Sequence, residues 1–88
     1  MNIYESAEDY LEAILMIKER KGYVRSVDIA DELQFSKASV SVAMKNLREK
    51  GHITVSEEGF LRLTDSGRAI AEMIRERHQL LTMWSNSI

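Results

Sequence analysis

The stretch "SVDIADELQFSKASVSVAMKNLREKGHITV", residues 26–55, contains two helical patterns separated by the short break "QFS". The inward-facing positions of the first pattern are Ile29, Ala30 and Leu33, and those of the second are Val40, Met44 and Leu47, with Ala43 beside them. Ser36 is a good N-cap for the second helix, and Gly51 is a typical helix stop. Two short helices joined by a three- or four-residue turn predict a helix-turn-helix.

The turn departs from the usual pattern at one position. Gln34 stands where many such turns have glycine, so we expect the backbone there to adopt a different or more strained conformation. Taken alone, the two helices also fit a helical hairpin that only builds a core.

A β-hairpin after Gly51 favours the DNA-binding interpretation. "HITV" (52–55) and "FLRLT" (60–64) have period-2 apolar residues and flank the glycine-containing turn "SEEG". A helix-turn-helix followed by such a wing is a recurrent DNA-binding architecture. The tip, Glu57-Glu58, is acidic and would be repelled by phosphate, so we expect the wing to lie beside the DNA backbone with Arg62 as its useful cation.

Two further helices complete the predicted fold. The first runs from Ser6 to about Arg20, and the last follows Thr64 and reads "DSGRAIAEMIRERHQLLTMW". The predicted buried stripes are Tyr10, Leu11, Ile14, Leu15 and Ile17 in the first helix, and Ile70, Met73, Ile74, Leu81 and Trp84 in the last. The fold class is therefore mainly α: a winged helix-turn-helix with three helices, a two-stranded hairpin and a long C-terminal helix.

The second helix of the motif carries the side chains that suit DNA. Its first turns hold short polar and cationic groups, where recognition residues reach base edges in the major groove. Cations near its end suit phosphate contacts. The predicted DNA-binding residues are Ser36, Lys37, Ala38, Ser39, Ser41, Lys45, Arg48, Lys50 and, on the wing, Arg62.

Composition limits the other possibilities. The 88 residues suit one small domain, residues 1–88, with a net charge of −2. Residues 1–12 carry four acids and no base, whereas residues 34–68 carry six bases against four acids.

The absence of cysteine excludes thiolate metal sites and cysteine nucleophiles and fits a cytoplasmic setting. No apolar run approaches the roughly 18 residues of a membrane span. No nucleophile–base constellation is present, and we predict that the protein is not an enzyme.

Asp9 and Glu12 lie three residues apart and project from one face of the first helix, together with Met16. Acids in a first helical turn are favoured by the helix dipole without any metal. His78 borders the apolar stripe of the last helix and by itself fits a packed or solvated residue. Two carboxylates with one imidazole would also suit Mn²⁺, Fe²⁺ or Zn²⁺.

Four segments, "SAEDYLEAI", "GYVRSVDIADEL", "SKASVSVAMKNLREKGHI" and "LRLTDSGRAIAEMIRERHQLL", in this order resemble the amino-terminal part of the diphtheria-toxin-repressor family, and within it the manganese-responsive transport regulators. The resemblance implies a cytosolic, homodimeric repressor that binds operator DNA when Mn²⁺ is bound and controls metal-ion homeostasis genes. It implies metal ligands at Asp9, Glu12 and His78. The iron-responsive branch typically has methionine at the position of Asp9, which favours manganese over Fe²⁺.

One departure from this family concerns the end of the chain. Family members continue into a helical dimerisation domain that supplies further metal ligands, two glutamates and a histidine, whereas this sequence ends in "SNSI" at residue 88. We therefore expect that domain to be absent and the metal site to be incomplete. The alternative function is a metal-independent winged-helix fragment that acts as a protein-interaction module.

Overall fold

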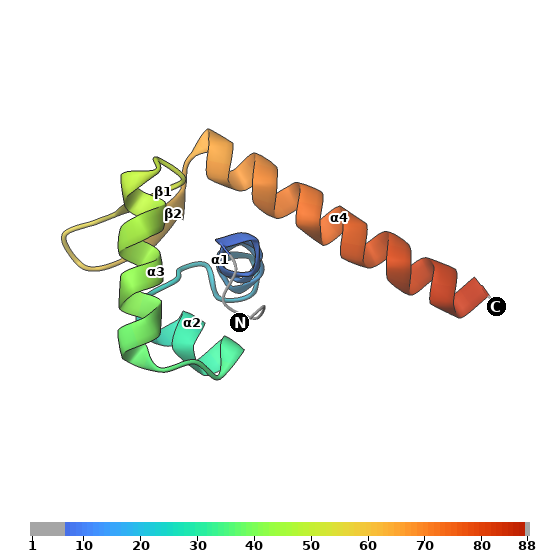
Figure 1. The fold of residues 1–88 in the computed structure, drawn as a ribbon, viewed down its shortest axis with the longest axis horizontal. Helices are drawn as coiled ribbons and strands as arrows, with labels where there is room; N and C mark the ends of the chain where they lie inside the picture. The colour runs from blue at the N-terminus through green and yellow to red at the C-terminus, as the bar shows by residue number, and fades with distance from the viewer. Residues whose placement is uncertain (1–6, 88) are drawn as a thin grey trace.

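The computed structural model describes the backbone of residues 7–87 and the side chains of residues 7–77. Its elements, in chain order, are α1 (Ala7–Lys21), α2 (Ser26–Leu33), α3 (Lys37–Glu49), β1 (Ile53–Val55), β2 (Leu61–Leu63) and α4 (Asp65–Ser87). The first three helices and the hairpin are grouped together, and α4 projects away from them toward its C-terminal end (Figure 1). The predicted winged helix-turn-helix is confirmed.

Local hydrogen bonds explain where α2 and α3 begin. The Asp28 carboxylate accepts a hydrogen bond from the backbone N–H of Arg25 at 2.9 Å, at the start of α2. The Ser36 hydroxyl accepts one from the N–H of Ser39 at 3.1 Å, which confirms Ser36 as the N-cap of α3. Between the helices Gln34 has φ 61° and ψ 36°, the left-handed region in which glycine is ordinarily found. The strained turn predicted at Gln34 is therefore confirmed.

The wing is an antiparallel pair in which Ile53 faces Leu63 and Val55 faces Leu61. Its turn closes through a hydrogen bond from the Gly59 N–H to the Ser56 carbonyl oxygen at 2.9 Å. Gly59 has φ 88°, a conformation that other residues rarely adopt. The segment before α2 also pairs with the wing, because Arg25 forms an isolated antiparallel bridge with Phe60, the residue that directly follows the turn. The wing is thus attached to the start of the helix-turn-helix on the turn side of its strands.

The core lies between α1, α2, α3, the inner face of the hairpin and the first turns of α4. All five predicted α1 positions are buried, and so are Ile29, Ala30 and the predicted α3 stripe. The prediction for Met73 in α4 was wrong, because its side chain is 48% exposed while Ala71 is fully buried. Leu81 and Trp84 lie outside the residues whose side chains are described.

Close contacts between residues 64–67 and residues 51–52 set the direction in which α4 leaves the wing. The Thr64 hydroxyl donates a hydrogen bond to the Gly51 carbonyl oxygen at 2.6 Å and accepts one from the Gly67 N–H at 3.3 Å. His52 Nδ1 lies 3.1 Å from the Ser66 hydroxyl. A Cβ atom on Gly67 would overlap the His52 carbonyl oxygen. The start of α4 is therefore pressed against the chain between α3 and β1, and only glycine fits there.

Candidate nucleic-acid interface and acidic groove

The surface of α3 that points away from the core is defined by Ala38, Ser41, Val42 and Lys45. These residues follow the i, i+3, i+4, i+7 spacing of one helix face, and all four are exposed. The buried Val40, Met44 and Leu47 occupy the opposite face of the helix. We call the exposed set the outward face of α3. Its side chains belong to one rigid helix that the core holds from behind.

The outward face lies within a cationic surface. Four basic side chains on or directly after α3 are exposed, and Glu49 is the one acid in the same helix. The exposed cations are Lys37, Lys45, Arg48 and Lys50. Such a surface attracts a polyanion although the chain as a whole is slightly negative.

The predicted serines differ in their availability. The Ser36 hydroxyl accepts from the Ser39 backbone and donates to the Ser39 hydroxyl at 3.0 Å, so it is used in the cap of α3. Ser39 is only partly exposed, whereas Ser41 is exposed. Of the three, Ser41 is therefore the hydroxyl best placed to meet a ligand.

Arg25 is an exposed cation outside the set of predicted DNA-binding residues. Its guanidinium carbon lies 4.5 Å from the centroid of the Phe60 ring, and Tyr23 meets the same ring edge-on at 5.8 Å. Lys21 Nζ in turn lies 4.9 Å from the centroid of the Tyr23 ring. This cation–aromatic row joins the α1–α2 connection to the wing. No local pattern predicts it, because Arg25 and Phe60 are 35 positions apart in the sequence.

The beginning of α2 also carries an ion pair. Lys21 Nζ and Asp28 Oδ1 are 2.7 Å apart. The hydrogen bond from Lys21, together with the one from the Arg25 backbone, lowers the pKa of the Asp28 carboxyl below its ordinary value. The hydrogen bond with Asp28 in turn raises the pKa of the Lys21 ammonium above its ordinary value. Asp28 is thus an ionised link between the end of α1 and the helix-turn-helix.

Arg62 lies in a different place from the other predicted DNA contacts. It lines a groove of about 300 Å³ between α1, β2 and α4, together with Lys18 and Arg68. The acidic tip of the wing, Glu57-Glu58, is exposed as the sequence indicates. Arg62 is therefore a cation in the middle of β2, and Arg25 lies beside the wing, where it pairs with Phe60 on the turn side of that strand.

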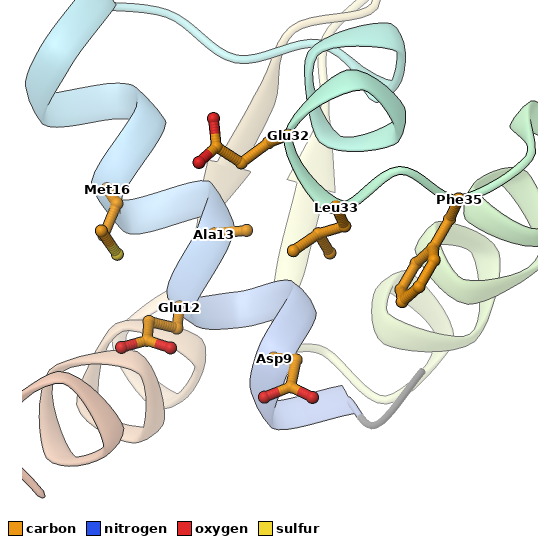
Figure 2. Close-up of a pocket in the computed structure, with 7 residues that line it drawn as sticks. All are labelled: Asp9, Glu12, Ala13, Met16, Glu32, Leu33 and Phe35. Atoms are coloured by element: carbon orange, nitrogen blue, oxygen red, sulfur yellow. The ribbon is translucent and has the colours of Figure 1, made fainter. Parts of the chain in front are cut away.

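The predicted metal-binding acids lie on α1. Asp9 and Glu12 are half-buried and line a groove of about 480 Å³ with Met16, against Leu33 and Phe35. Figure 2 shows the Glu12 carboxylate turned away from Leu33, toward the side on which α4 passes. Both acids already take part in polar or electrostatic interactions. We call this hollow the acidic groove; its remaining lining residues are Ala13 and Glu32.

The fit of the acidic groove to a metal ion depends on its donors. Two carboxylates on one helix face match the oxygen preference of Mn²⁺ and similar ions. Glu32 forms an ion pair with Arg20, with 2.8 Å between Oε1 and the guanidinium nitrogen. His78 is a residue of α4, but its side chain lies outside those described. Among residues 7–77, no three acidic, histidine or cysteine side chains form a cluster that could hold a metal ion.

The fold and the outward face of α3 define the class: a winged helix-turn-helix domain. The chain belongs to the iron-dependent repressor family, because residues 2–60 match the model described as "Iron dependent repressor, N-terminal DNA binding domain". This match confirms the resemblance found in the sequence. The family is one of transcriptional regulators and not of enzymes.

Individual relatives agree with this assignment. The chain is 38% identical over 76 residues, 86% of its length and 53% of the relative's, to the "HTH-type transcriptional regulator MntR" of Shouchella clausii. Solved structures of Lactococcus lactis ZitR are similar in fold. Wild-type ZitR has a TM-score of 0.72 at 27% identity, covering 88% of this chain and 55% of ZitR. Its complex with DNA has a TM-score of 0.71 at 25% identity, covering 88% and 57%.

These matches cover part of each relative. The chain spans about half the length of the curated relatives that it matches. Within the described part of the chain, none of the helices combines the length and apolar character needed to cross a membrane.

Proposed function

We propose that this chain is the DNA-binding part of a metal-responsive transcriptional repressor that acts on operator DNA in the cytoplasm. The observation that carries the proposal is the outward face of α3, where Ser41 and Lys45 are exposed within a cationic surface and the helix is held from behind by a packed core. The solved complex of ZitR with DNA, a similar fold, supports DNA as the partner.

In the proposed interface α3 enters the major groove and the flanking cations contact phosphates. Lys37, Lys45, Arg48 and Lys50 position the domain, while Ala38 and Ser41 reach base edges. The helix N-terminus at Ser36 and Ser39 faces the DNA backbone. Arg25, which lies at the start of α2 beside the wing, adds a phosphate contact on the other side of the helix-turn-helix. Arg62 contributes charge from strand β2 of the wing.

The first test measures duplex binding against salt concentration. The probe is a fluorescent 30-base-pair duplex of random sequence, followed by anisotropy at several KCl concentrations. Lys37→Ala/Arg48→Ala should weaken binding about tenfold or more and make the salt dependence shallower by about 0.9 per lost phosphate contact. Lys18→Ala/Arg77→Ala, which removes the same charge away from α3, is the matched control. Equal binding by both double variants would reject α3 as the interface.

A metal ion is the proposed effector of this repressor. Asp9 and Glu12 would provide carboxylate oxygens and His78 an imidazole nitrogen for Mn²⁺, with Fe²⁺ as the second choice. When bound, the ion would be coordinated by donors from both helices and would so link α1 to α4. Glu12 lies on the side of α1 that α4 passes, which supports its inclusion. We propose that the protein acts as a homodimer, in which this link fixes the spacing of two helix-turn-helix units.

The second test separates the metal proposal from DNA binding. Trp84, the single tryptophan of the chain, reports Mn²⁺ titration by fluorescence, with calorimetry and molecular mass measured in parallel. Duplex affinity should rise with Mn²⁺ and fall again with chelator. Glu12→Gln should remove this rise and leave metal-free binding unchanged, whereas the control Glu8→Gln, an exposed acid outside the acidic groove, should behave as wild type. No fluorescence change and no heat would reject the metal site.

The acidic wing tip favours a second candidate function, a module that binds another protein. Glu57 and Glu58 are exposed at the point of the hairpin that would otherwise approach DNA. Duplex binding that is absent at every salt concentration would support this function over the first.

A further inference from the structure

Val42 is an apolar side chain in an otherwise polar and cationic setting. It is 61% exposed, the highest value among the large hydrophobic side chains that the structure describes. It lies in the middle of the outward face, one helical turn after Ala38 and next to Ser41 and Lys45. The core stripe of α3 occupies the opposite side of the helix, so Val42 lies outside the core of the domain.

The side chain of Val42 is well suited to make a contact in a fixed direction. Valine is branched at Cβ and in a helix strongly prefers one rotamer, so little conformational entropy is lost when it is covered. It lies five residues after Lys37, the first residue of α3, which is about 8 Å along the helix axis. Val42 is therefore in the second turn of α3, within the N-terminal part of a recognition helix that contacts base edges.

The chemistry around Val42 limits what can cover it. Its neighbours on the helix surface include Lys45, Ser41 and Asn46, which suit an anionic, hydrogen-bonding partner. A protein partner held by the hydrophobic effect requires a large contiguous apolar patch. Val42 lines a hollow with Ala38, Ala43 and Tyr10, but Ala43 is half-buried and Tyr10 is buried, so Ala38 is the one further exposed apolar side chain there. The major groove of DNA combines phosphates and polar base edges with one apolar group, the C5-methyl of thymine.

We infer that Val42 determines operator specificity by packing against the C5-methyl group of a thymine. This inference rests on the proposed function, because it assumes that α3 enters the major groove. The cations of α3 give affinity without sequence preference, and Val42 adds the preference for thymine over cytosine at one position in each half-site. A valine cannot satisfy the polar edge that cytosine or guanine presents at the same place, so those bases are disfavoured as well.

The test removes the methyl group and leaves base pairing intact. Duplexes that bind the protein are first selected from a randomised pool, and each thymine of the best duplex is then replaced in turn by uracil. Wild type should lose about three- to fourfold in affinity at one thymine per half-site, the change expected for one buried methyl group. Val42→Ala should bind the thymine and uracil duplexes equally at that position.

Two controls keep the result interpretable. Val42→Ala lies on an exposed helix surface and improves helix propensity, so its unfolding transition should match that of wild type or exceed it. Val27→Ala makes the same chemical change at an exposed position of α2 and should keep the sensitivity to uracil.

Each outcome decides between the two claims. A wild type that is insensitive to every uracil substitution, or a Val42→Ala variant that keeps the sensitivity, overturns the role of Val42 while DNA binding stands. A change of molecular mass in Val42→Ala without any change in duplex preference identifies the face as a contact between copies of the chain and also overturns it. Failure to bind any duplex overturns the proposed function and this inference together.

Discussion

The outward face of α3 and the acidic groove of α1 are both candidate binding surfaces, but they are built in opposite ways. The α3 surface comes from one helix of 13 residues whose back is buried in the core. The metal proposal for the acidic groove joins Asp9 and Glu12 to a residue of α4 about 66 positions later in the chain. The first surface is complete within a local segment. The second requires two distant helices to be held in register.

This difference indicates which surface depends on the rest of the fold. Any substitution that leaves the core intact also leaves the outward face of α3 in place, because a helix fixes the directions of its own side chains. The α1–α4 pairing depends instead on the junction at which α4 leaves the wing. Damage to that junction should therefore affect metal response before it affects metal-free DNA binding.

The largest expected effect breaks the junction directly. Gly67→Ala places a Cβ against the His52 carbonyl oxygen. This oxygen belongs to the backbone and cannot move aside as the end of a flexible side chain could. We expect a loss of about 3 kcal/mol in the free energy of unfolding, measured by urea denaturation. Gly59→Ala, at the open tip of the wing, meets no atom within 4 Å and should lose less, through its positive φ alone. Equal losses would contradict the close contact at Gly67.

The next effect tests whether the α3 surface works independently of the acidic groove. Lys45→Ala removes one exposed cation from the outward face and should lower duplex affinity about three- to tenfold. Because the contact belongs to α3 alone, the factor should be the same with Mn²⁺ and with chelator. Anisotropy titrations under both conditions measure it. A factor that changes with metal would show that the two surfaces are coupled at the level of single contacts.

A smaller effect concerns the link between α1 and the helix-turn-helix. Asp28→Ala removes the ion pair with Lys21 and the hydrogen bond at the start of α2. Solvent screens the pair, so the expected loss at neutral pH is roughly 1 kcal/mol. Since the pKa of Asp28 is lower in the folded state, its contribution is present above the unfolded pKa of about 4 and is lost as the pH falls through the folded value.

The measurement for Asp28 is urea unfolding of wild type and variant at pH 7 and at successively lower pH. The two proteins should converge in stability below pH 4. A difference that persists unchanged into strong acid would assign the effect to helix packing instead of the carboxylate.

The smallest effect is a gain. Gln34 occupies the left-handed region, and glycine adopts that conformation without a Cβ clash. Relief of strain is partly offset by the greater freedom of glycine in the unfolded chain and by loss of the Gln34 side-chain hydrogen bond to the Asp31 carbonyl oxygen. We therefore expect Gln34→Gly to raise the free energy of unfolding by about 0.5 kcal/mol with duplex binding unchanged. A loss of stability would mean that the hydrogen bond outweighs the strain.

Much of the fold could be predicted because its signals are local. Ser36 as a cap, the strain at Gln34 and the buried stripes of α1 and α3 all follow from spacing within a few residues. The error at Met73 has a clear cause. The side of α4 that packs inward begins at Gly67 and continues through Ala71 to Ile74, so small residues allow the close approach. A pattern of large apolar residues does not indicate that Gly67 and Ala71 are buried.

The candidate site could be predicted only in part, for the same reason. The cations of α3 are evident from the sequence, because one helix presents them. The exposure of Val42 is evident only when the face is compared with the core stripe behind it. The contact of Arg25 with Phe60 requires the hairpin to fold back onto the α1–α2 connection, which no local pattern encodes. The roles assigned to Asp9, Glu12 and His78 remain predictions.

Because α4 projects from the domain, it acts as a lever arm whose pivot is the Thr64–Gly67 junction. The helix has 23 residues, so its arm is about 35 Å long. A rotation of 10° at its base would sweep the far end through about 6 Å, nearly the rise of two base pairs of DNA. Whatever the far end of α4 holds is therefore positioned by an angle set where glycine meets a single carbonyl group. In the proposed homodimer, a change of that angle too small to disturb the core would be enough to bring the two helix-turn-helix units into or out of phase with two half-sites of the DNA.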